Sequence, residues 1–541
     1  MQNISESNHA KSRRSLSLSL SRSAHFLATH KRQIILALSI FVFIVALLLR
    51  LGFAYQKSGF HIDESASISI STGNWTTAVK DGTYFGKELK ERIYFDDNSI
   101  GDLLHDLKEL WKNNYGDGTA HPNLYYLLLR AWNFDVKSGN FDWLKSRGIG
   151  LNIVFFTLGF YATFILISKI FLRQSLLVPL FLAMIFWNSA SVSNTIFVRP
   201  YALQEMLLLV FALNCFVFYQ LGFANTKEAF VRYKLFFAWF IFATALLCLS
   251  HYFSLFFIAF AFIFLVLISQ KNIVPLIIVL LGSIVIAQIF YIGYFDFLNG
   301  YHAKDGAVKL LFIGFWDNLT DSVSAGAEIL SAHFCNVYGF AILCVAFGIA
   351  LYYRIFTRNA METNIFLLGF FSVACVWFAL VLFVAPFKVL RYVMPIFPFL
   401  YFGVIFVLNG IKKPLLQGIL GVGFVASLFI NYTVEYLYKE PFIFTQNKNL
   451  PVLLHFPRFH HEGYFTFAFD DVQIYIAESD LARLQEKMRE FDAFYLLSEA
   501  IFNHLWGYKQ SSFQAYINTD VNIIENRERG YFHLFEKDMG K

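Results

Sequence analysis

The chain has 541 residues, of which 57% are hydrophobic and 15% are charged, and its net charge is +6. Soluble proteins are typically about 45–50% apolar and about 25% charged, so this composition excludes an ordinary soluble domain and indicates a protein with many membrane spans. The basic residues are dispersed, many of them at the ends of apolar runs, which argues against a nucleic-acid-binding protein. The five cysteines show neither zinc-site nor disulfide spacing.

The N-terminal segment 1–32 is polar, serine-rich and basic, and the apolar run after it is long enough to be a retained first membrane helix with a cytoplasmic N-terminus. Basic residues favour the cytoplasmic side of a membrane, so the basic loops orient the helices that follow. Eleven helices are predicted, at about 33–55, 148–168, 175–192, 201–221, two within 235–269, 273–295, 334–353, 364–384, 391–409 and 414–433.

The stretch 235–269 is apolar apart from Ser250-His251-Tyr252, and basic residues flank both of its ends. One helix of that length would extend roughly 50 Å at about 1.5 Å per residue, far more than a membrane core of about 30 Å. Two crossings are therefore predicted, with His251 at the outer tip of a tight hairpin.

Three segments are predicted to lie outside the membrane. The first, 56–147, contains a short apolar piece from Leu124 that is predicted to be a helix lying in the membrane interface. The second, 296–332, is predicted to be a loop. The tail, 434–541, is predicted to be a separate small α/β domain, which either caps the membrane unit or binds a ligand.

Local patterns predict the elements of the tail. Apolar and polar residues alternate as in a strand at 464–477. Further strands are predicted at 493–497, 521–524 and 531–535, and the last two flank Asn526–Gly530 as a predicted hairpin. A helix capped by Ser479 would place Leu481, Leu484, Met488 and Phe491 on one face.

Six ionisable residues stand out because the predicted topology places all of them at the outer face of the membrane: Asp63, Glu64, His121, Arg199, His251 and Arg391. Ionisable groups at the edge of a bilayer are costly and are candidates for function. Each alone has an ordinary explanation, since acids favour helix N-termini and long basic side chains extend to the interface. Together, cations beside an acid pair suit a substrate that carries a phosphate at the level of the lipid headgroups.

Five short motifs follow one another in an order that is similar to a known family. They are Asp63-Glu64, His121-Pro122-Asn123-Leu124-Tyr125-Tyr126, Arg199-Pro200-Tyr201, His251-Tyr252-Phe253 and Arg391-Tyr392-Val393-Met394-Pro395. In these motifs residues 33–433 resemble the polyprenyl-phosphate-sugar-dependent glycosyltransferases of the GT-C fold, in particular the protein-mannosyltransferase and aminoarabinose-transferase (glycosyltransferase family 39-like) branch. The chain departs from the family pattern at Asn123, where a second proline is usual, and at Gln204 and Glu205, near which some relatives carry an aspartate.

The resemblance implies an all-α, GT-C-like polytopic membrane unit and a role for each matching residue. Asp63 matches the acid proposed as catalytic base, and Glu64 matches its acidic neighbour. The residues implied to lie near the donor phosphate and its lipid are His121, Arg199, Tyr201, His251, Arg391 and Tyr392. A divalent metal ion is left open, with Glu64 and His121 as its candidate ligands, and no other cofactor is implied.

The expected reaction moves a sugar from a polyprenyl-phosphate carrier to a lipid, glycan or protein acceptor, with inversion, on the extracytoplasmic side of a bacterial inner membrane. Asp63 would accept the proton of the acceptor hydroxyl, and cations such as Arg391 would stabilise the leaving phosphate. Three alternatives stay open: a polysaccharide polymerase or ligase, a transporter of lipid-linked glycans, and a non-catalytic scaffold. The sequence contains no P-loop and no dinucleotide-binding glycine pattern.

Overall fold

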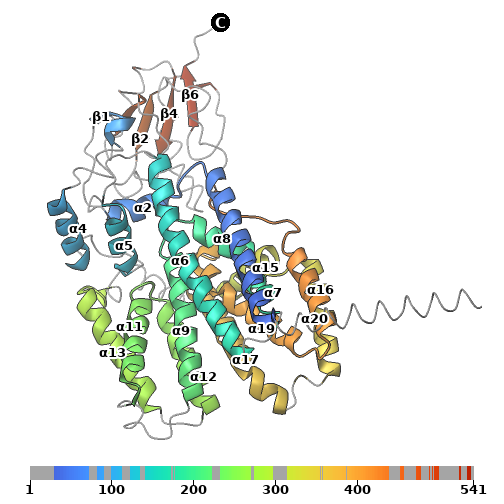
Figure 1. Ribbon diagram of the computed structural model, residues 1–541. Helices are drawn as coiled ribbons and strands as arrows, with labels where there is room; N and C mark the ends of the chain where they lie inside the picture. The colour runs from blue at the N-terminus through green and yellow to red at the C-terminus, as the bar shows by residue number, and fades with distance from the viewer. Residues whose placement is uncertain are drawn as a thin grey trace, which may run out of the picture.

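The molecule is a bundle of helices with one small β-sheet at one end (Figure 1). The computed structural model describes residues 30–71, 82–89, 99–112, 122–134, 141–171, 175, 177–221, 232–269, 273–296, 314–353, 355, 358–385, 387–437, 451–455, 471–476, 487, 490, 493–498, 523–524 and 533–537.

Helices account for most of the described residues. In chain order they are His30–Gln56, α2 (Ile62–Ser71), α4 (Ile100–Lys112), α5 (Leu124–Trp132), α6 (Phe141–Ile170), α7 (Val178–Phe186), α8 (Ser189–Ile196), α9 (Tyr201–Leu221), α11 (Lys234–Cys248), α12 (Ser254–Ser269), α13 (Val274–Phe290), α15 (Phe315–His333), α16 (Val337–Tyr352), α17 (Arg358–Val384), α18 (Leu390–Val393), η3 (Met394–Ile396), α19 (Phe397–Asn409) and α20 (Pro414–Ser427).

Five of the described helices are long and apolar enough to cross a membrane, and a sixth span results if the bent pair α15–α16 counts as one. These five are His30–Gln56, Asp142–Ile170, Tyr201–Leu221, Asn364–Val384 and Leu390–Asn409. Shorter apolar helices, namely α11, α12, α13 and α20, belong to the same bundle. The chain is therefore a helical membrane protein, while the count of eleven spans stays a prediction.

The hairpin predicted within 235–269 is confirmed as two helices joined by a tight turn. α11 ends at Cys248 and α12 begins at Ser254, so His251 lies in the turn between them. The turn is stabilised because Nδ1 of His251 accepts a hydrogen bond from the Phe253 backbone N–H at 3.1 Å. The His251 carbonyl oxygen accepts a second one from the Ser254 N–H at 3.0 Å.

Two predicted boundaries are wrong. The segment 175–192, predicted as one helix, is divided into α7 and α8, because Asn188 caps α8 by accepting a hydrogen bond from the Ser191 N–H. The segment 296–332, predicted as a loop, contains most of α15. The acidic residues of α15 lower its mean hydropathy, and the helix meets α16 at 89°.

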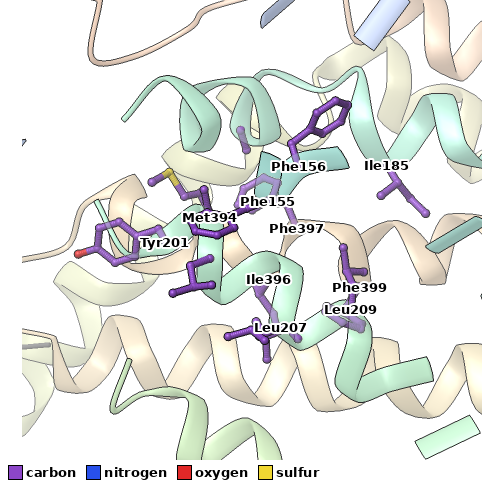
Figure 2. Close-up of a cluster of buried hydrophobic side chains, with 14 of the residues drawn as sticks. Phe155, Phe156, Ile185, Tyr201, Leu207, Leu209, Met394, Ile396, Phe397 and Phe399 are labelled. Carbon is purple, nitrogen blue, oxygen red and sulfur yellow. The ribbon is translucent and has the colours of Figure 1, made fainter. Parts of the chain in front are cut away.

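The apolar core brings the beginnings of two distant helices together. Figure 2 shows part of this core, where α6, α7, α9 and the segment 394–399 meet. Tyr201, the first residue of α9, lies at one end of the cluster beside Met394, and its hydroxyl points away from the apolar side chains (Figure 2). Arg199 and Arg391 lie two and three residues before these contacts, so packing of the core determines where both arginines lie.

One six-stranded sheet contains all the strands in the described parts of the chain. They are β1 (Gly82–Phe85), β2 (Val452–His455), β3 (Gln473–Ile476), β4 (Ala493–Ser498), β5 (Ile523–Ile524) and β6 (His533–Lys537), in the order β1-β3-β2-β4-β6-β5. β2 is parallel to β3 and β4, and the outer pairs are antiparallel. β1 lies within the segment 56–147, with Thr83 opposite Tyr475. The sheet thus contains residues from two regions that the sequence predicts as separate.

The tail predictions have mixed outcomes. The strand predicted at 493–497 is confirmed as β4. The strands predicted at 521–524 and 531–535 correspond to the antiparallel pair β5–β6, but Ile523 and Ile524 pair with Lys537 and Glu536, beyond the predicted second strand. Of the strand predicted at 464–477, only the part that forms β3 is described. The predicted helix after Ser479 lies outside the described residues.

Candidate active site

A hydrogen-bonded cap at the start of α2 determines the position of Asp63. His61 precedes the helix, and its Nδ1 accepts a hydrogen bond from the Asp63 backbone N–H at 3.0 Å. In return, the Glu64 carboxylate accepts the His61 backbone N–H at 2.7 Å. The pattern resembles a capping box, but histidine replaces Ser or Thr and accepts the N–H of the second helical residue instead of the third. The Asp63 side chain, 27% exposed, is thereby held at the first turn of α2.

Glu64 is a buried anchor beneath Asp63. Its side chain is 0% exposed, and Oε2 lies 2.9 Å from Nζ of Lys57, which is equally buried. Oε1 accepts the Val198 backbone N–H at 2.8 Å, and Lys57 also donates to the Tyr436 carbonyl oxygen. These contacts join the first helix, α2, the link before α9 and the chain after α20 at one point.

Arg391, in α18, pairs with Asp63. Its Nη1 lies 2.7 Å from Oδ2 of Asp63, and its side chain is 8% exposed. The same Nη1 lies 3.4 Å from Nε2 of His61. Residues of α2 and α18, which lie more than 300 positions apart in the sequence, are therefore in direct contact.

Arg199 approaches the same turn of α2 from the link between α8 and α9. Its Nη1 donates to the Asp63 carbonyl oxygen at 2.9 Å and to Oγ of Ser67 at 3.0 Å. Arg199 and Arg391 are both more than nine-tenths buried, and within the described parts of the chain Nε of each has no hydrogen-bond partner. Two buried guanidinium groups with unsatisfied N–H groups make a site suited to an anion.

Aromatic side chains line the site next to the arginines. The Tyr201 ring centroid lies 5.5 Å from that of His251 and 6.3 Å from that of Tyr392. The Arg391 guanidinium lies 5.2 Å from the centroid of the Tyr392 ring. Tyr201 therefore connects the turn of the α11–α12 hairpin to the start of α18.

The charges of the site follow from burial and from the arginines. Burial opposes ionisation of Asp63, but the positive charge of Arg391, with smaller contributions from His61 and Arg199, outweighs it and lowers the pKa of Asp63 to about 2. Burial lowers the pKa of His61 to about 4, which Asp63 opposes and Arg391 reinforces. Asp63 is thus ionised and His61 uncharged near neutral pH.

Glu64 has a different environment from its neighbour. Burial raises the pKa of the Glu64 carboxyl, while the charge of Lys57 and the hydrogen bond from the Val198 backbone N–H oppose that rise. All of these contacts are made by the chain itself, so Glu64 positions α2 and does not face the arginines.

Most of the residues singled out in the sequence lie together. Asp63, Arg199, Tyr201, His251, Arg391 and Tyr392 are connected by the contacts above. His121 lies outside the described residues. Within the described parts of the chain, no group of three His, Cys, Asp or Glu side chains could hold a metal ion. A metal site formed by Glu64 and His121 stays a prediction.

Sequence reasoning missed His61 and Lys57. A signal for His61 was available, because a glutamate three residues after the residue that precedes a helix is the pattern of a capping box. Lys57 offered no such signal, since a lysine just beyond a membrane helix is usually an interfacial residue.

A second buried polar network, also missed, lies inside the bundle. Arg50 of the first helix is 0% exposed and donates to Oγ1 of Thr195 at 2.9 Å and to Oγ of Ser191 at 2.8 Å. Ser191 and Asn194 both donate to the Glu205 carboxylate. The network connects the first helix to α8 and α9, and its groups are already bonded to one another.

Comparisons with protein-family models, with curated proteins and with solved structures find no match to this chain. The case for a function therefore rests on the geometry around Asp63.

Proposed function

We propose that the chain is a membrane glycosyltransferase that moves a sugar from a polyprenyl-phosphate carrier to an acceptor on the extracytoplasmic side. One observation carries the proposal: an ionised, partly exposed carboxylate, Asp63, lies against two buried arginines at the beginnings of apolar helices. Sugar transfer from a lipid phosphate needs a base for the acceptor hydroxyl and cations for the leaving phosphate, and this arrangement supplies both.

In the proposed reaction, the Asp63 carboxylate accepts the proton of the acceptor hydroxyl as its oxygen forms a bond to the anomeric carbon. The bond between that carbon and the phosphate oxygen breaks, and its electron pair leaves with the phosphate. Arg391 and Arg199 stabilise the negative charge of the leaving group through charge-assisted hydrogen bonds. A single displacement of this kind inverts the anomeric centre.

The ion pair between Asp63 and Arg391 supports an order of events. Without a donor, Arg391 lowers the pKa of Asp63 to about 2, which makes the carboxylate a weak base. A phosphate bound to Arg391 competes for its positive charge and so raises the pKa of Asp63. Asp63 therefore becomes an effective base when the donor is in place.

The placement of the arginines supports a lipid-linked donor. Arg199 directly precedes the apolar helix Tyr201–Leu221, and Arg391 is the second residue of the apolar stretch Leu390–Asn409. Guanidinium groups at the ends of membrane helices lie at the level of lipid headgroups, where a carrier phosphate is found. The basic loops of the sequence support the extracytoplasmic side. Lys57, His61 and Val198 already bind both carboxylate oxygens of Glu64, so the proposed reaction uses no divalent ion at Glu64 and His121.

Transfer of a labelled sugar in proteoliposomes tests the proposal. The purified chain is offered a panel of polyprenyl-monophosphate sugars together with extracted envelope acceptors, and the expected result is transfer, with inversion, from at least one donor. Transfer of a preassembled glycan from a polyprenyl diphosphate would instead identify a polymerase or ligase. Movement of a lipid-linked glycan across the bilayer without a new bond would identify a transporter, and either result would overturn the proposal.

A further inference from the structure

His61 lies between the charged groups of the site but has no part in the reaction described above. Its Nδ1 is 3.4 Å from Oδ2 of Asp63, and its Nε2 is 3.4 Å from Nη1 of Arg391. The rings of Phe197 and Tyr436 pack edge-on against the imidazole at 5.7 Å and 6.2 Å between centroids. The ring is therefore held in one orientation, with each nitrogen next to a charged side chain.

The hydrogen bonds of His61 determine which ring nitrogen carries the proton. Nδ1 accepts the Asp63 backbone N–H at 3.0 Å, which is shorter than either of the 3.4 Å contacts. A nitrogen that accepts a hydrogen bond carries no proton, so an uncharged imidazole in this position carries its proton on Nε2. Burial lowers the pKa of His61 to about 4, which keeps the ring uncharged near neutral pH.

Nε2–H of His61 and Nη1 of Arg391 are then two hydrogen-bond donors only 3.4 Å apart. An anionic oxygen placed between these two N–H groups would accept a hydrogen bond from each of them. Nε of Arg391, which has no hydrogen-bond partner within the described parts of the chain, adds a further donor on the same guanidinium.

His251, whose ring centroid lies 5.5 Å from that of Tyr201, makes the same kind of backbone hydrogen bond. Its Nδ1 also accepts the backbone N–H of the residue two positions later, Phe253, at 3.1 Å. Burial, reinforced by Arg199, lowers its pKa to about 3. Two uncharged histidines with the same backbone hydrogen bond thus lie near the two arginines. Histidines of this kind suit hydrogen-bond donation to an anion better than proton exchange at neutral pH.

We propose that His61 is a further residue of the phosphate subsite and that its Nε2–H donates a hydrogen bond to the phosphate oxygen bound by Arg391. The inference rests on the proposed function for the lipid carried by that phosphate, whereas the subsite itself requires only a phosphate group. Its action is binding, and the proton on Nε2 stays in place throughout.

The substitution His61→Asn separates capping of α2 from phosphate binding. Asn is a preferred helix N-cap, so its side-chain oxygen can accept the Asp63 N–H, but no atom of Asn reaches the position of Nε2. We expect normal folding and a donor KM raised by about tenfold, as for one lost hydrogen bond to a charged group. His61→Gln, whose amide nitrogen can reach the position of Nε2, recovers part of that loss.

His105→Asn, on an exposed position of α4, is the matched control and keeps the wild-type KM.

Solid-state ¹⁵N NMR of histidine-labelled protein in liposomes tests the tautomer directly. The difference between the wild-type and His61→Asn spectra isolates the His61 signals among those of the 14 histidines. At pH 7.5 we expect an unprotonated Nδ1, a protonated Nε2 and a shift of the Nε2 signal when polyprenyl phosphate or inorganic phosphate is added. A protonated Nδ1 would overturn the inference. So would an Nε2 signal that shifts when polyprenol without a phosphate is added but does not shift with polyprenyl phosphate or inorganic phosphate.

The two tests fail in different ways if the proposed function is wrong. A chain that shows the tautomer and the phosphate-dependent shift but transfers no sugar would overturn the glycosyltransferase proposal and leave the subsite standing. Normal sugar transfer with an unchanged donor KM in His61→Asn would overturn the role of His61 and leave the enzyme proposal standing.

Discussion

At the scale of single residues, the basicity of Asp63 depends on Arg391. Arg391 makes the largest contribution that lowers the pKa of Asp63 from its ordinary value of 3.8 to about 2, against the opposing effect of burial. The Asp63 carboxylate therefore stays ionised at neutral and mildly acidic pH. This dependence on one neighbour can be tested by removing the neighbour.

Replacing Arg391 by glutamine is expected to move the acid limb of the pH–rate profile to higher pH. Without the guanidinium, burial raises the pKa of Asp63, so the base becomes protonated, and transfer is lost, at a pH where the wild type is still active. Residual transfer by Arg391→Gln, measured between pH 3 and 7, checks this. Arg391→Lys keeps the charge and should keep most of the wild-type profile. If the acid limb of the pH–rate profile is the same in Arg391→Gln and in the wild type, protonation of Asp63 does not limit the rate, and the prediction is contradicted.

The sequence alone indicated which residue types were out of place, and the structure adds the atoms in contact. Asp63, Arg199 and Arg391 could be selected because charges at membrane helix ends are costly. Their sequence did not indicate that Arg391 pairs with the Asp63 side chain while Arg199 binds its backbone carbonyl. The sequence also could not tell which of the two adjacent acids faces an arginine. In the structure the Asp63 side chain contacts Arg391, whereas the Glu64 side chain contacts Lys57.

At the scale of elements, the buried pair of Lys57 and Glu64 ties α2 to the membrane helices. Replacing Glu64 by glutamine leaves the Lys57 ammonium buried without its counter-charge, and breaking a buried pair in this way typically costs about 3–5 kcal/mol. We expect Glu64→Gln to lower the thermal unfolding midpoint of detergent-solubilised protein strongly. Lys57→Met combined with Glu64→Gln should recover much of the loss, since no uncompensated charge remains. A double variant no more stable than Glu64→Gln would show that the charge itself is not the cause.

Close packing of α12 against α17 depends on Gly369. A Cβ atom at this position would lie 1.8 Å from the ring of Phe264. Small residues allow membrane helices to approach closely, and overpacking a filled interface costs about 1–3 kcal/mol. Gly369→Ala is therefore expected to lower the unfolding midpoint, and Phe264→Leu should restore it in combination.

The matched control for this substitution is Gly348→Ala in α16. A Cβ atom there meets no other atom within 4 Å. The unfolding midpoint of Gly348→Ala should equal or exceed that of the wild type, because alanine favours a helix more than glycine does. Equal midpoints for Gly348→Ala and Gly369→Ala would contradict the proposed close approach of α12 and α17.

Helices were predicted correctly from the sequence where the alternation of basic loops fixed the number of crossings. Pairings between strands that lie far apart in the sequence were not predicted. The hairpin around His251 followed from counting crossings between basic loops, which does not depend on any single boundary. α15 was missed because its polar residues hide a helix from a hydropathy criterion. The pairing of β1 with β3 was missed because partners far apart in sequence leave no local pattern.

At the scale of the whole molecule, the sheet connects the segment 56–147, through β1, to the tail. Thr83 of β1 lies opposite Tyr475 of β3, and opposite residues of antiparallel strands have Cα atoms about 4.5–5.5 Å apart, within the range for a disulfide. In a chain whose five native cysteines are replaced by alanine, Thr83→Cys with Tyr475→Cys should therefore crosslink on mild oxidation.

The control pair for this crosslink uses the opposite edge of the sheet. β5 is the last strand in the order, so Thr83→Cys with Ile523→Cys should not crosslink. Crosslinking is read as a band shift after proteolytic cleavage between 438 and 450. Equal crosslinking of both pairs, or of neither, would contradict the shared sheet.

The central claim is that Asp63 is the base of a sugar transfer from a lipid phosphate. Its most direct test compares wild type with Asp63→Asn in proteoliposomes, measuring labelled-sugar transfer and polyprenyl-phosphate binding on the same samples. Asn has nearly the same shape but cannot accept the proton, so we expect transfer to fall by roughly a hundredfold or more while binding is retained. Near-normal transfer by a folded Asp63→Asn protein would contradict the assignment of Asp63 as the base.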